Sequence, residues 1–263
     1  MVSIRLFHLV VLTPDTFPTF SSFTAKCLWI LLPVIPCQSK EKQWPIIFYL
    51  IFGVVKFILN RWLHRWLLIC ESNDSYMRVF IYFLSILTFS YVVDIETVFV
   101  RIITRDKYTL QSLNNFPFFS QSLREFWGRR YNRIISTIFN ESIFRPLSLF
   151  IPSRSIVSLL IFIISGLFHV HIVFIVFNEP SSALPTFACF FLNGIACCIE
   201  AHLAIKLPPL LGWLVTHSVL FVTAPMCLGT FARDKSVFFG LDGLSTYGDQ
   251  WISKLPMPKS CPK

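Results

Sequence analysis

The run SIVSLLIFIISGLFHVHIVFIVF at Ser155–Phe177 contains no Asp, Glu, Lys or Arg and only two histidines. A helix needs about 20 mostly apolar residues to cross the hydrocarbon core of a bilayer, so this run predicts a membrane-spanning helix. The composition agrees, because 54% of the 263 residues are hydrophobic and only 14% are charged. A soluble domain of this length carries far more polar residues. The sequence therefore predicts an integral membrane protein.

Further apolar runs predict that the chain crosses the membrane several times. They lie at Trp44–Leu59, Val79–Val93, Leu184–Ile205 and Leu210–Phe231. In the second run, Asp94 and Glu96 mark either its end or a polar point inside it. A shorter run, Ala25–Ile35, contains a proline, and a re-entrant or interfacial segment explains it as well as a sixth span. We expect an all-α, polytopic transmembrane helical bundle with an N-terminal segment (1–43), a core (44–232) and a polar C-terminal tail (233–263).

The basic charge and the cysteines narrow the classes of partner. The net charge is +9, but the basic residues lie between apolar runs, so positive-inside loops explain them better than nucleic-acid binding. A phosphate-bearing substrate is a second, compatible interpretation. The 8 cysteines show no C-x-x-C pair, so we expect neither a disulfide framework nor a metal site.

The stretch Ser120–Asn140 has an amphipathic pattern. Its apolar residues recur at gaps of three and four, at Leu123, Phe126, Trp127, Tyr131, Ile134, Ile135 and Ile138. We therefore expect one interfacial amphipathic helix here, with Arg124, Arg129 and Arg133 on its polar face and an ion pair between Glu125 and Arg129. These arginines, with Arg145 and Arg154, predict that the loop from Arg101 to Arg154 faces the cytoplasm.

One of the two histidines in Ser155–Phe177 is expected to face the bundle. Steps of three and four join His169 to a stripe of small and hydroxyl residues, Ser155, Ser158 and Ser165, which favours close helix packing. His171 follows an apolar row that faces lipid. An imidazole inside a membrane is a functional candidate, but a packed histidine that bonds a neighbouring helix explains His169 equally well. For Glu200 we prefer a structural hydrogen bond between helices.

Three blocks of sequence resemble a known family. Residues 120–132, SQSLREFWGRRYN, resemble the S-L-x-x-F-W-G-R-R-W-N signature of the wax synthase branch of membrane-bound O-acyltransferases. Residues 164–169, ISGLFH, resemble the S-G-L-x-H helix of that family. Residues 190–200, FFLNGIACCIE, are similar to a third block, in which Gly194 and Glu200 match. The blocks follow the order of the family, and the first is highly specific.

The resemblance implies a long-chain-alcohol O-fatty-acyltransferase that takes acyl-CoA as donor and a lipid alcohol as acceptor, giving a wax-type ester. It implies an integral, multi-pass protein of the endoplasmic reticulum that needs no metal or bound cofactor. The implied catalytic positions are His169 and Asn132, and the implied substrate-binding positions are Trp127, Arg129, Arg130 and Arg133. The chain departs from the pattern where Tyr131 replaces Trp, Val170 replaces a frequent Glu and Asn193 replaces a frequent His.

The chemistry fits these residues. Ester formation requires a base to take the alcohol proton, and a neutral His169 suits this because burial disfavours the charged imidazolium. Asn132 would donate an amide N–H to the developing oxyanion, and the arginines would hold the phosphates of CoA. Two alternatives stay open: a sterol or terpenoid alcohol as acceptor, or a catalytically inactive membrane protein that keeps the bundle.

Overall fold

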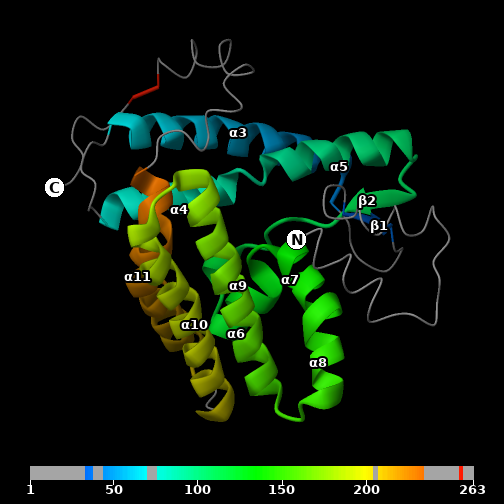
Figure 1. Ribbon diagram of the computed structural model, residues 1–263. Coiled ribbons are helices and arrows are strands. Elements are labelled where there is room, and N and C mark those ends of the chain that lie inside the picture. Colours follow the sequence, from blue (N-terminus) through cyan, green and yellow to red (C-terminus); the bar gives the residue numbers. More distant parts are fainter. Residues whose placement is uncertain (1–32, 38–43, 70–75, 204–206, 234–254, 257–263) are drawn as a thin grey trace.

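The computed structural model describes residues 33–37, 44–69, 76–203, 207–233 and 255–256, and these are almost entirely helical (Figure 1). The long helices are α3 (Ile46–Ile69), α4 (Tyr76–Thr88), α5 (Tyr91–Ile103), α9 (Arg154–Phe177), α10 (Ala183–Leu203) and α11 (Pro209–Arg233). Strands β1 (Val34–Pro36) and β2 (Tyr108–Leu110) form a short antiparallel pair. The prediction of an all-α membrane bundle is confirmed.

In the described part of the chain, five helical stretches are long and apolar enough to cross a membrane. They are Ile46–Leu67, Val79–Ile103, Arg154–Phe177, Pro180–Leu203 and Pro209–Leu228. Each overlaps most of one of the five predicted runs, and the first two extend further toward the C-terminus than expected. Of the doubtful sixth run, residues 25–32 lie outside the described residues, and Val34–Pro36 form strand β1 rather than a helix. The predicted boundaries of the terminal segments remain predictions.

The second stretch, Val79–Ile103, extends beyond Val93 because the charged side chain of Asp94 forms an ion pair. Helices α4 and α5 meet at a break around Phe89 and Ser90, and Asp94 follows one turn later. The Asp94 carboxylate is buried and lies 2.6 Å from the Lys56 ammonium of α3. A carboxylate paired in this way costs far less to bury than an isolated one. Asp94 therefore sits at a polar point inside the stretch rather than at its end.

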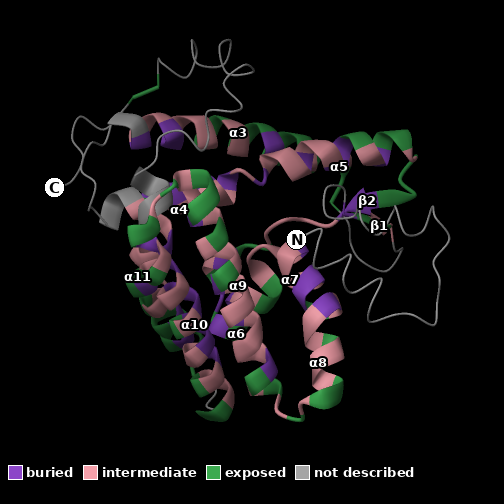
Figure 2. Cartoon of the chain, in the orientation of Figure 1, coloured by how far each residue is buried: buried purple, intermediate pink, exposed green. Residues whose placement is uncertain are grey.

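Helices α9, α10 and α11 lie side by side, whereas α3 crosses above them (Figure 1). Helices α9 and α10 approach each other closely at Gly194, because a Cβ atom there would lie 2.8 Å from Cβ of Phe162. Any larger side chain would force the two helices apart. Buried residues, purple in Figure 2, occur on α6 and on the neighbouring parts of α9 and α10. Helices α9 and α10 pack against each other there.

The expected single helix from Ser120 to Asn140 is wrong. The region instead consists of short pieces: η2 (Pro117–Phe119), α6 (Leu123–Glu125), the π-helical η3 (Phe126–Arg130), α7 (Arg133–Phe139), η4 (Asn140–Phe144) and α8 (Arg145–Phe150). The helix ends because Tyr131 is extended and Asn132 has left-handed backbone angles, φ 44° and ψ 60°. Asparagine tolerates this conformation better than most residues, so the signature asparagine is also the point where the chain turns.

The π-helical turn also corrects the predicted ion pair. Glu125 pairs with Arg130, at 2.6 Å between Oε1 and Nε, and not with Arg129. A π-helix brings together residues five apart, whereas the prediction assumed the spacing of four of an α-helix. The arginines consequently do not share one polar face, and each has its own surroundings.

Candidate active site

His169 lies on α9 with one ring nitrogen engaged and the other available. Its Nδ1 is 2.8 Å from the carbonyl oxygen of Ser165. A carbonyl can only accept a hydrogen bond, so Nδ1 carries the proton and, in the neutral ring, Nε2 carries the lone pair. Within the described residues no hydrogen bond reaches Nε2. The backbone of α9 thus fixes the tautomer that a general base at Nε2 requires.

The predicted orientation of the two histidines is confirmed. The His169 ring stacks on Phe190 of α10, with ring centroids 4.1 Å apart and an interplanar angle of 29°. His171 is exposed, as is Leu167 on the same apolar row. His169 therefore faces the neighbouring helix, and His171 points to the surface that meets lipid.

Trp127 of the FWGRR segment also packs against Phe190. Its ring lies 6.1 Å from that of Phe190 and 5.9 Å from that of Phe162, centroid to centroid. Its indole N–H donates to Oδ1 of Asn193 over 3.2 Å. Phe190 therefore contacts both Trp127 and His169, and the first and second sequence blocks meet at a residue of the third.

Asn193 is a residue that sequence reasoning noted only as a departure. It is fully buried, and its amide N–H₂ donates to the Cys189 carbonyl and to Oγ1 of Thr223 on α11, each over 2.9 Å. Together with the Trp127 bond, one side chain links α10, α11 and the signature segment. An amide can accept and donate at once, which explains why asparagine serves at a position where the family pattern has histidine.

Glu200 holds the start of the signature segment. Its carboxylate accepts from the Leu123 backbone N–H over 2.7 Å and from Arg124 Nε over 3.2 Å. The expectation of a structural hydrogen bond is confirmed, but the partner is this segment and not another spanning helix. A carboxylate at a helix N-terminus is also favoured by the helix dipole.

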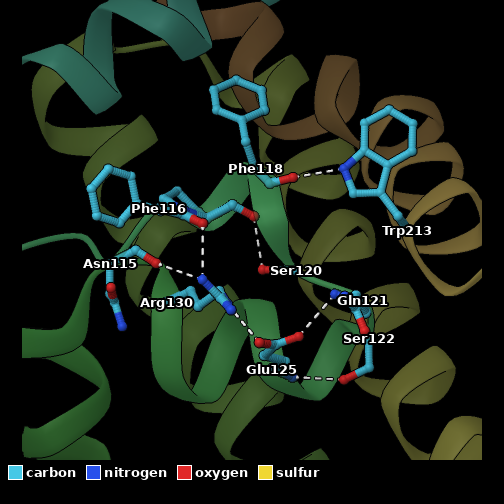
Figure 3. Close-up of polar contacts among 10 residues, drawn as sticks. Asn115, Phe116, Phe118, Ser120, Gln121, Ser122, Glu125, Arg130 and Trp213 are labelled. Carbon is cyan, nitrogen blue, oxygen red and sulfur yellow. Dashed lines mark hydrogen bonds and ion pairs between the residues drawn. The ribbon is translucent and has the colours of Figure 1, made fainter. Parts of the chain in front are cut away.

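Arg130, at the end of η3, reaches back to the loop before α6 and forms the centre of a polar cluster there (Figure 3). Besides Glu125, its guanidinium reaches the carbonyls of Asn115 and Phe116, each over 3.3 Å. Glu125 in turn accepts from the Gln121 N–H. Burial of the Glu125 carboxyl opposes ionisation, but the Gln121 and Arg130 bonds outweigh it and lower its pKa. Arg130 thus shapes the loop, a role that the sequence did not indicate.

Asn132 has structural contacts and one unused group. Its Oδ1 accepts from the Ile135 N–H over 3.3 Å and caps α7, and its backbone N–H donates to Oδ1 of Asn114 over 3.0 Å. Within the described residues no bond engages its amide nitrogen. No hydrogen bond joins Asn132 to His169 there, so the structure does not pair the two predicted catalytic side chains directly.

The remaining arginines differ in exposure. Arg133 donates from Nη1 to Oγ of Ser112 over 2.9 Å. Arg124 is largely exposed beside Glu200. Arg129 is exposed, with no hydrogen bond or ion pair to the described residues. Of the predicted phosphate-binding set, Arg129 is therefore the most available cation.

Tyr131 fills the position where the family pattern has tryptophan. Its ring stacks on Phe126, with centroids 5.1 Å apart and planes 9° from parallel, and lies 5.5 Å from the ring of Trp127. Burial, more than the neighbouring thiols, raises the pKa of its phenol, so the side chain stays neutral. Tyr131 therefore acts as an aromatic packing residue beside Trp127.

Among the described residues no group of three or more His, Cys, Asp or Glu side chains is placed so that it could hold a metal ion.

Three residues that take part in these contacts lie along α10. Glu200 lies near the C-terminal end of the helix, Asn193 precedes Glu200 by seven residues, and Phe190, on which His169 stacks, precedes it by ten. At about 1.5 Å per residue, the imidazole lies roughly 15 Å along the helix from the Arg124–Glu200 pair. These features define a helical membrane protein in which a half-buried imidazole stacks against aromatic residues, at some distance along α10 from an arginine-bearing surface.

Comparison with known proteins agrees with this class. Residues 110–192 match the membrane bound O-acyl transferase family. The protein "Probable long-chain-alcohol O-fatty-acyltransferase 9" of Arabidopsis thaliana is 32% identical over 100 residues, which are 35% of this chain and 28% of the relative. "Probable long-chain-alcohol O-fatty-acyltransferase 8" of the same plant is 30% identical over 120 residues, 41% of this chain and 35% of the relative. No solved structure matches.

The predicted resemblance is therefore confirmed for the central segment, which is related to the wax synthase-like branch of the membrane-bound O-acyl transferases. The matched segment includes Trp127, Asn132 and His169. The chain matches only about a third of the length of these relatives.

Proposed function

We propose that this protein transfers a fatty acyl group from acyl-CoA to the hydroxyl of a long-chain or similar lipid alcohol. The observation that carries the proposal is the contact of Phe190 with both Trp127 and the His169 ring, whose Nε2 is unengaged among the described residues. Through Phe190, the signature segment lies next to the half-buried imidazole that we propose as the base. The names of the relatives support the reaction class.

In the proposed reaction, Nε2 of His169 takes the proton of the alcohol while the alcohol oxygen attacks the thioester carbon. The carbon–sulfur bond then breaks, and the imidazolium returns the proton to the CoA thiolate. The products are an ester and free CoA. The Ser165 carbonyl stabilises the imidazolium through Nδ1–H, a task for which other enzymes use a carboxylate. This bond supplies an orienting partner although Val170 replaces the acidic residue.

The other predicted residues have distinct roles in this proposal. Asn132 uses its free amide N–H₂ to stabilise the oxyanion while its Oδ1 keeps the α7 cap. Trp127 forms the wall that separates the thioester from water, since water would otherwise hydrolyse it. Arg129 attracts the phosphates of CoA. Arg130 and Arg133 hold the signature segment that carries Arg129 in place, through their bonds to Glu125 and Ser112. The endoplasmic reticulum is the proposed location.

Membranes from a host that expresses the protein test the proposal with labelled acyl-CoA and a panel of alcohols. We expect ester formation with long-chain alcohols, and the sterols and terpenoid alcohols in the panel identify an alternative acceptor. His169→Ala should reduce the rate by about 10²–10⁴-fold, the usual contribution of a general base. His171→Ala is the matched control and should keep full activity. Equal activity of both variants would remove His169 from the mechanism.

A further inference from the structure

Thr186, near the start of α10, has a buried hydroxyl that no described residue engages. Thr186 is 0% exposed, and among the described residues no hydrogen bond reaches its Oγ1. Three other threonines buried in helices, Thr88, Thr97 and Thr223, each donate to the carbonyl four residues earlier, as Thr97 does to Val93 over 2.6 Å. The buried hydroxyl of Thr109 in strand β2 also lacks a hydrogen bond to the described residues. A buried hydroxyl without a hydrogen bond destabilises the folded state, because it has lost its hydrogen bonds to water. Such a group in a folded protein requires an explanation.

The packing of α9 against α10 sets the height of Thr186. The contacts at the two glycines place Phe162 opposite Gly194 and Gly166 opposite Phe190. Between these two pairs, α9 advances four residues while α10 goes back four. The next step pairs the backbone of Val170 with that of Thr186. The His169 imidazole points back along α9 to the Ser165 carbonyl and stacks on Phe190, so Thr186 lies one turn, roughly 6 Å, further along α10 than the ring. This separation is about the span of two hydrogen bonds to one shared oxygen atom.

The helical period sets the direction of Thr186. Asn193, seven residues later, and Cys197, eleven residues later, return to almost the same face of α10. Both are buried, and Asn193 bonds Thr223 of α11 and Trp127. Thr186 thus occupies the face of α10 that is turned to the interior of the bundle. It is fourteen residues, roughly 21 Å, from Glu200 at the arginine-rich end.

We propose that Thr186 binds the hydroxyl of the acceptor alcohol. This inference rests on the proposed function. The alcohol O–H donates to Nε2 of His169, and the Thr186 hydroxyl donates to a lone pair of the same oxygen. When the oxygen attacks the thioester, its proton passes to Nε2, and Thr186 keeps its own proton. Acyl-CoA is then held from the Arg124–Glu200 end, and the acceptor from the Thr186 end.

The first test separates the two substrates. Thr186→Val keeps the shape but removes the hydroxyl, and Thr186→Ser keeps the hydroxyl. We expect Thr186→Val to raise the KM for 1-hexadecanol by about 3–10-fold, the effect of one neutral hydrogen bond, with the KM for acyl-CoA unchanged. Thr186→Ser should restore the alcohol KM. Thr97→Val, at a buried threonine on α5 that bonds its own helix, is the control and should change neither value.

The second test measures binding without turnover. Purified protein in detergent is heated with 1-hexadecanol or with hexadecane, which lacks the hydroxyl. We expect the alcohol to raise Tm more than the alkane in wild type and Thr186→Ser, and this difference to vanish in Thr186→Val. Thr186→Ala replaces the valine variant if that variant does not fold. Alcohol binding without any acyl transfer by wild type would refute the proposed function alone.

Results that overturn the Thr186 proposal are equally specific. An alcohol KM and an alcohol-over-alkane Tm difference that both survive in Thr186→Val would show that the hydroxyl does not contact the acceptor. A rise in the acyl-CoA KM instead would place the thioester, and not the alcohol, at this residue. A loss of folded protein in both Val and Ser variants, with intact KM values in the remainder, would make Thr186 a packing residue.

Discussion

The α3–α5 region and the α9–α11 region both carry polar side chains inside apolar helices. The two regions differ in the hydrogen-bond and ion-pair partners of these side chains. In α3–α5, Lys56 pairs with Asp94 over 2.6 Å, and Arg101 pairs with Asp106 over 2.7 Å. Asn60 adds bonds to α4. In α9–α11, Nε2 of His169 and the hydroxyl of Thr186 have no hydrogen bond within the described structure. The charged pairs of the first region have their partners built in, although Nε1 of Trp66 and Oγ of Ser85 in that region are buried without a hydrogen bond to the described residues.

This difference distinguishes a structural polar cluster from a candidate site. Buried polar groups are expensive without partners, so a paired charge such as Asp94 needs no ligand to explain it. In the proposed function, the acceptor alcohol supplies the hydrogen bond that the unengaged Nε2 of His169 lacks. Variants in α9–α11 should therefore change turnover at constant protein level, and variants in α3–α5 should do the reverse.

The largest effect that sharpens this comparison is expected at Asn132. Asn132→Asp keeps an oxygen that can cap α7 and tolerates the left-handed backbone, but it loses the amide N–H₂. We expect kcat to fall by about 10²–10³-fold, the cost of one oxyanion donor, with Tm unchanged. Asn178→Asp, at the other left-handed asparagine, at the end of α9, is the control. Full activity of Asn132→Asp would leave Asn132 as a cap only.

Breaking the ion pair of α3 and α5 should produce the opposite pattern. Lys56→Met leaves the buried Asp94 carboxylate without its counter-charge. The loss of one partner of a buried pair costs about 3–5 kcal/mol, and the lower end applies because Lys56 is partly exposed. We expect a lower Tm and less folded protein, with kcat per folded molecule unchanged. Lys56→Met combined with Asp94→Asn should recover much of the Tm.

A changed kcat in folded Lys56→Met would break the comparison, since it would couple the α3–α5 pair to the chemistry. Size-exclusion chromatography of the solubilised protein provides the folded amount to which the rate is normalised.

The arginines should show a smaller difference between neighbours. Arg129 is exposed and unengaged among the described residues, whereas Arg130 bonds Glu125 and two carbonyls. Arg129→Gln should therefore raise the KM for acyl-CoA several-fold and leave the KM for alcohol unchanged, because only CoA carries phosphates. Salt screens exposed charges, so the effect should shrink at high ionic strength. Arg130→Gln should lower Tm at any salt concentration. An unaltered acyl-CoA KM in Arg129→Gln would leave the CoA contact unassigned.

The sequence predicted most of the helices and the orientation of His169, because both follow from long apolar runs with a clear helical period. It missed the breaks in Ser120–Asn140, since the apolar period continues through Tyr131 and Asn132 and only the backbone angles reveal the turn. It also missed the partners of Asn193, Glu200 and Arg130. These bonds join residues up to 77 positions apart, and a single sequence contains no signal for such pairs.

The smallest expected effect concerns pH and the loop around Arg130. The bonds from Gln121 and Arg130 lower the pKa of Glu125 below its ordinary value of 4.5 despite burial. A carboxyl whose pKa is lower in the folded state stabilises the protein fully above the ordinary pKa and loses this contribution as pH falls through the folded value. Wild-type Tm should therefore decline below about pH 4.5 by a small increment that Glu125→Gln lacks. Glu179→Gln, in the turn between α9 and η5 (Pro180–Ser182), where the carboxylate accepts from Ser181, should retain the wild-type slope. Because the loop connects α6 to Trp213 of α11 through the Phe118 carbonyl over 2.7 Å, the same acid range should also weaken the docking of the signature segment. Identical slopes for wild type and Glu125→Gln would show that the Glu125–Arg130 pair contributes nothing to the stability of the bundle.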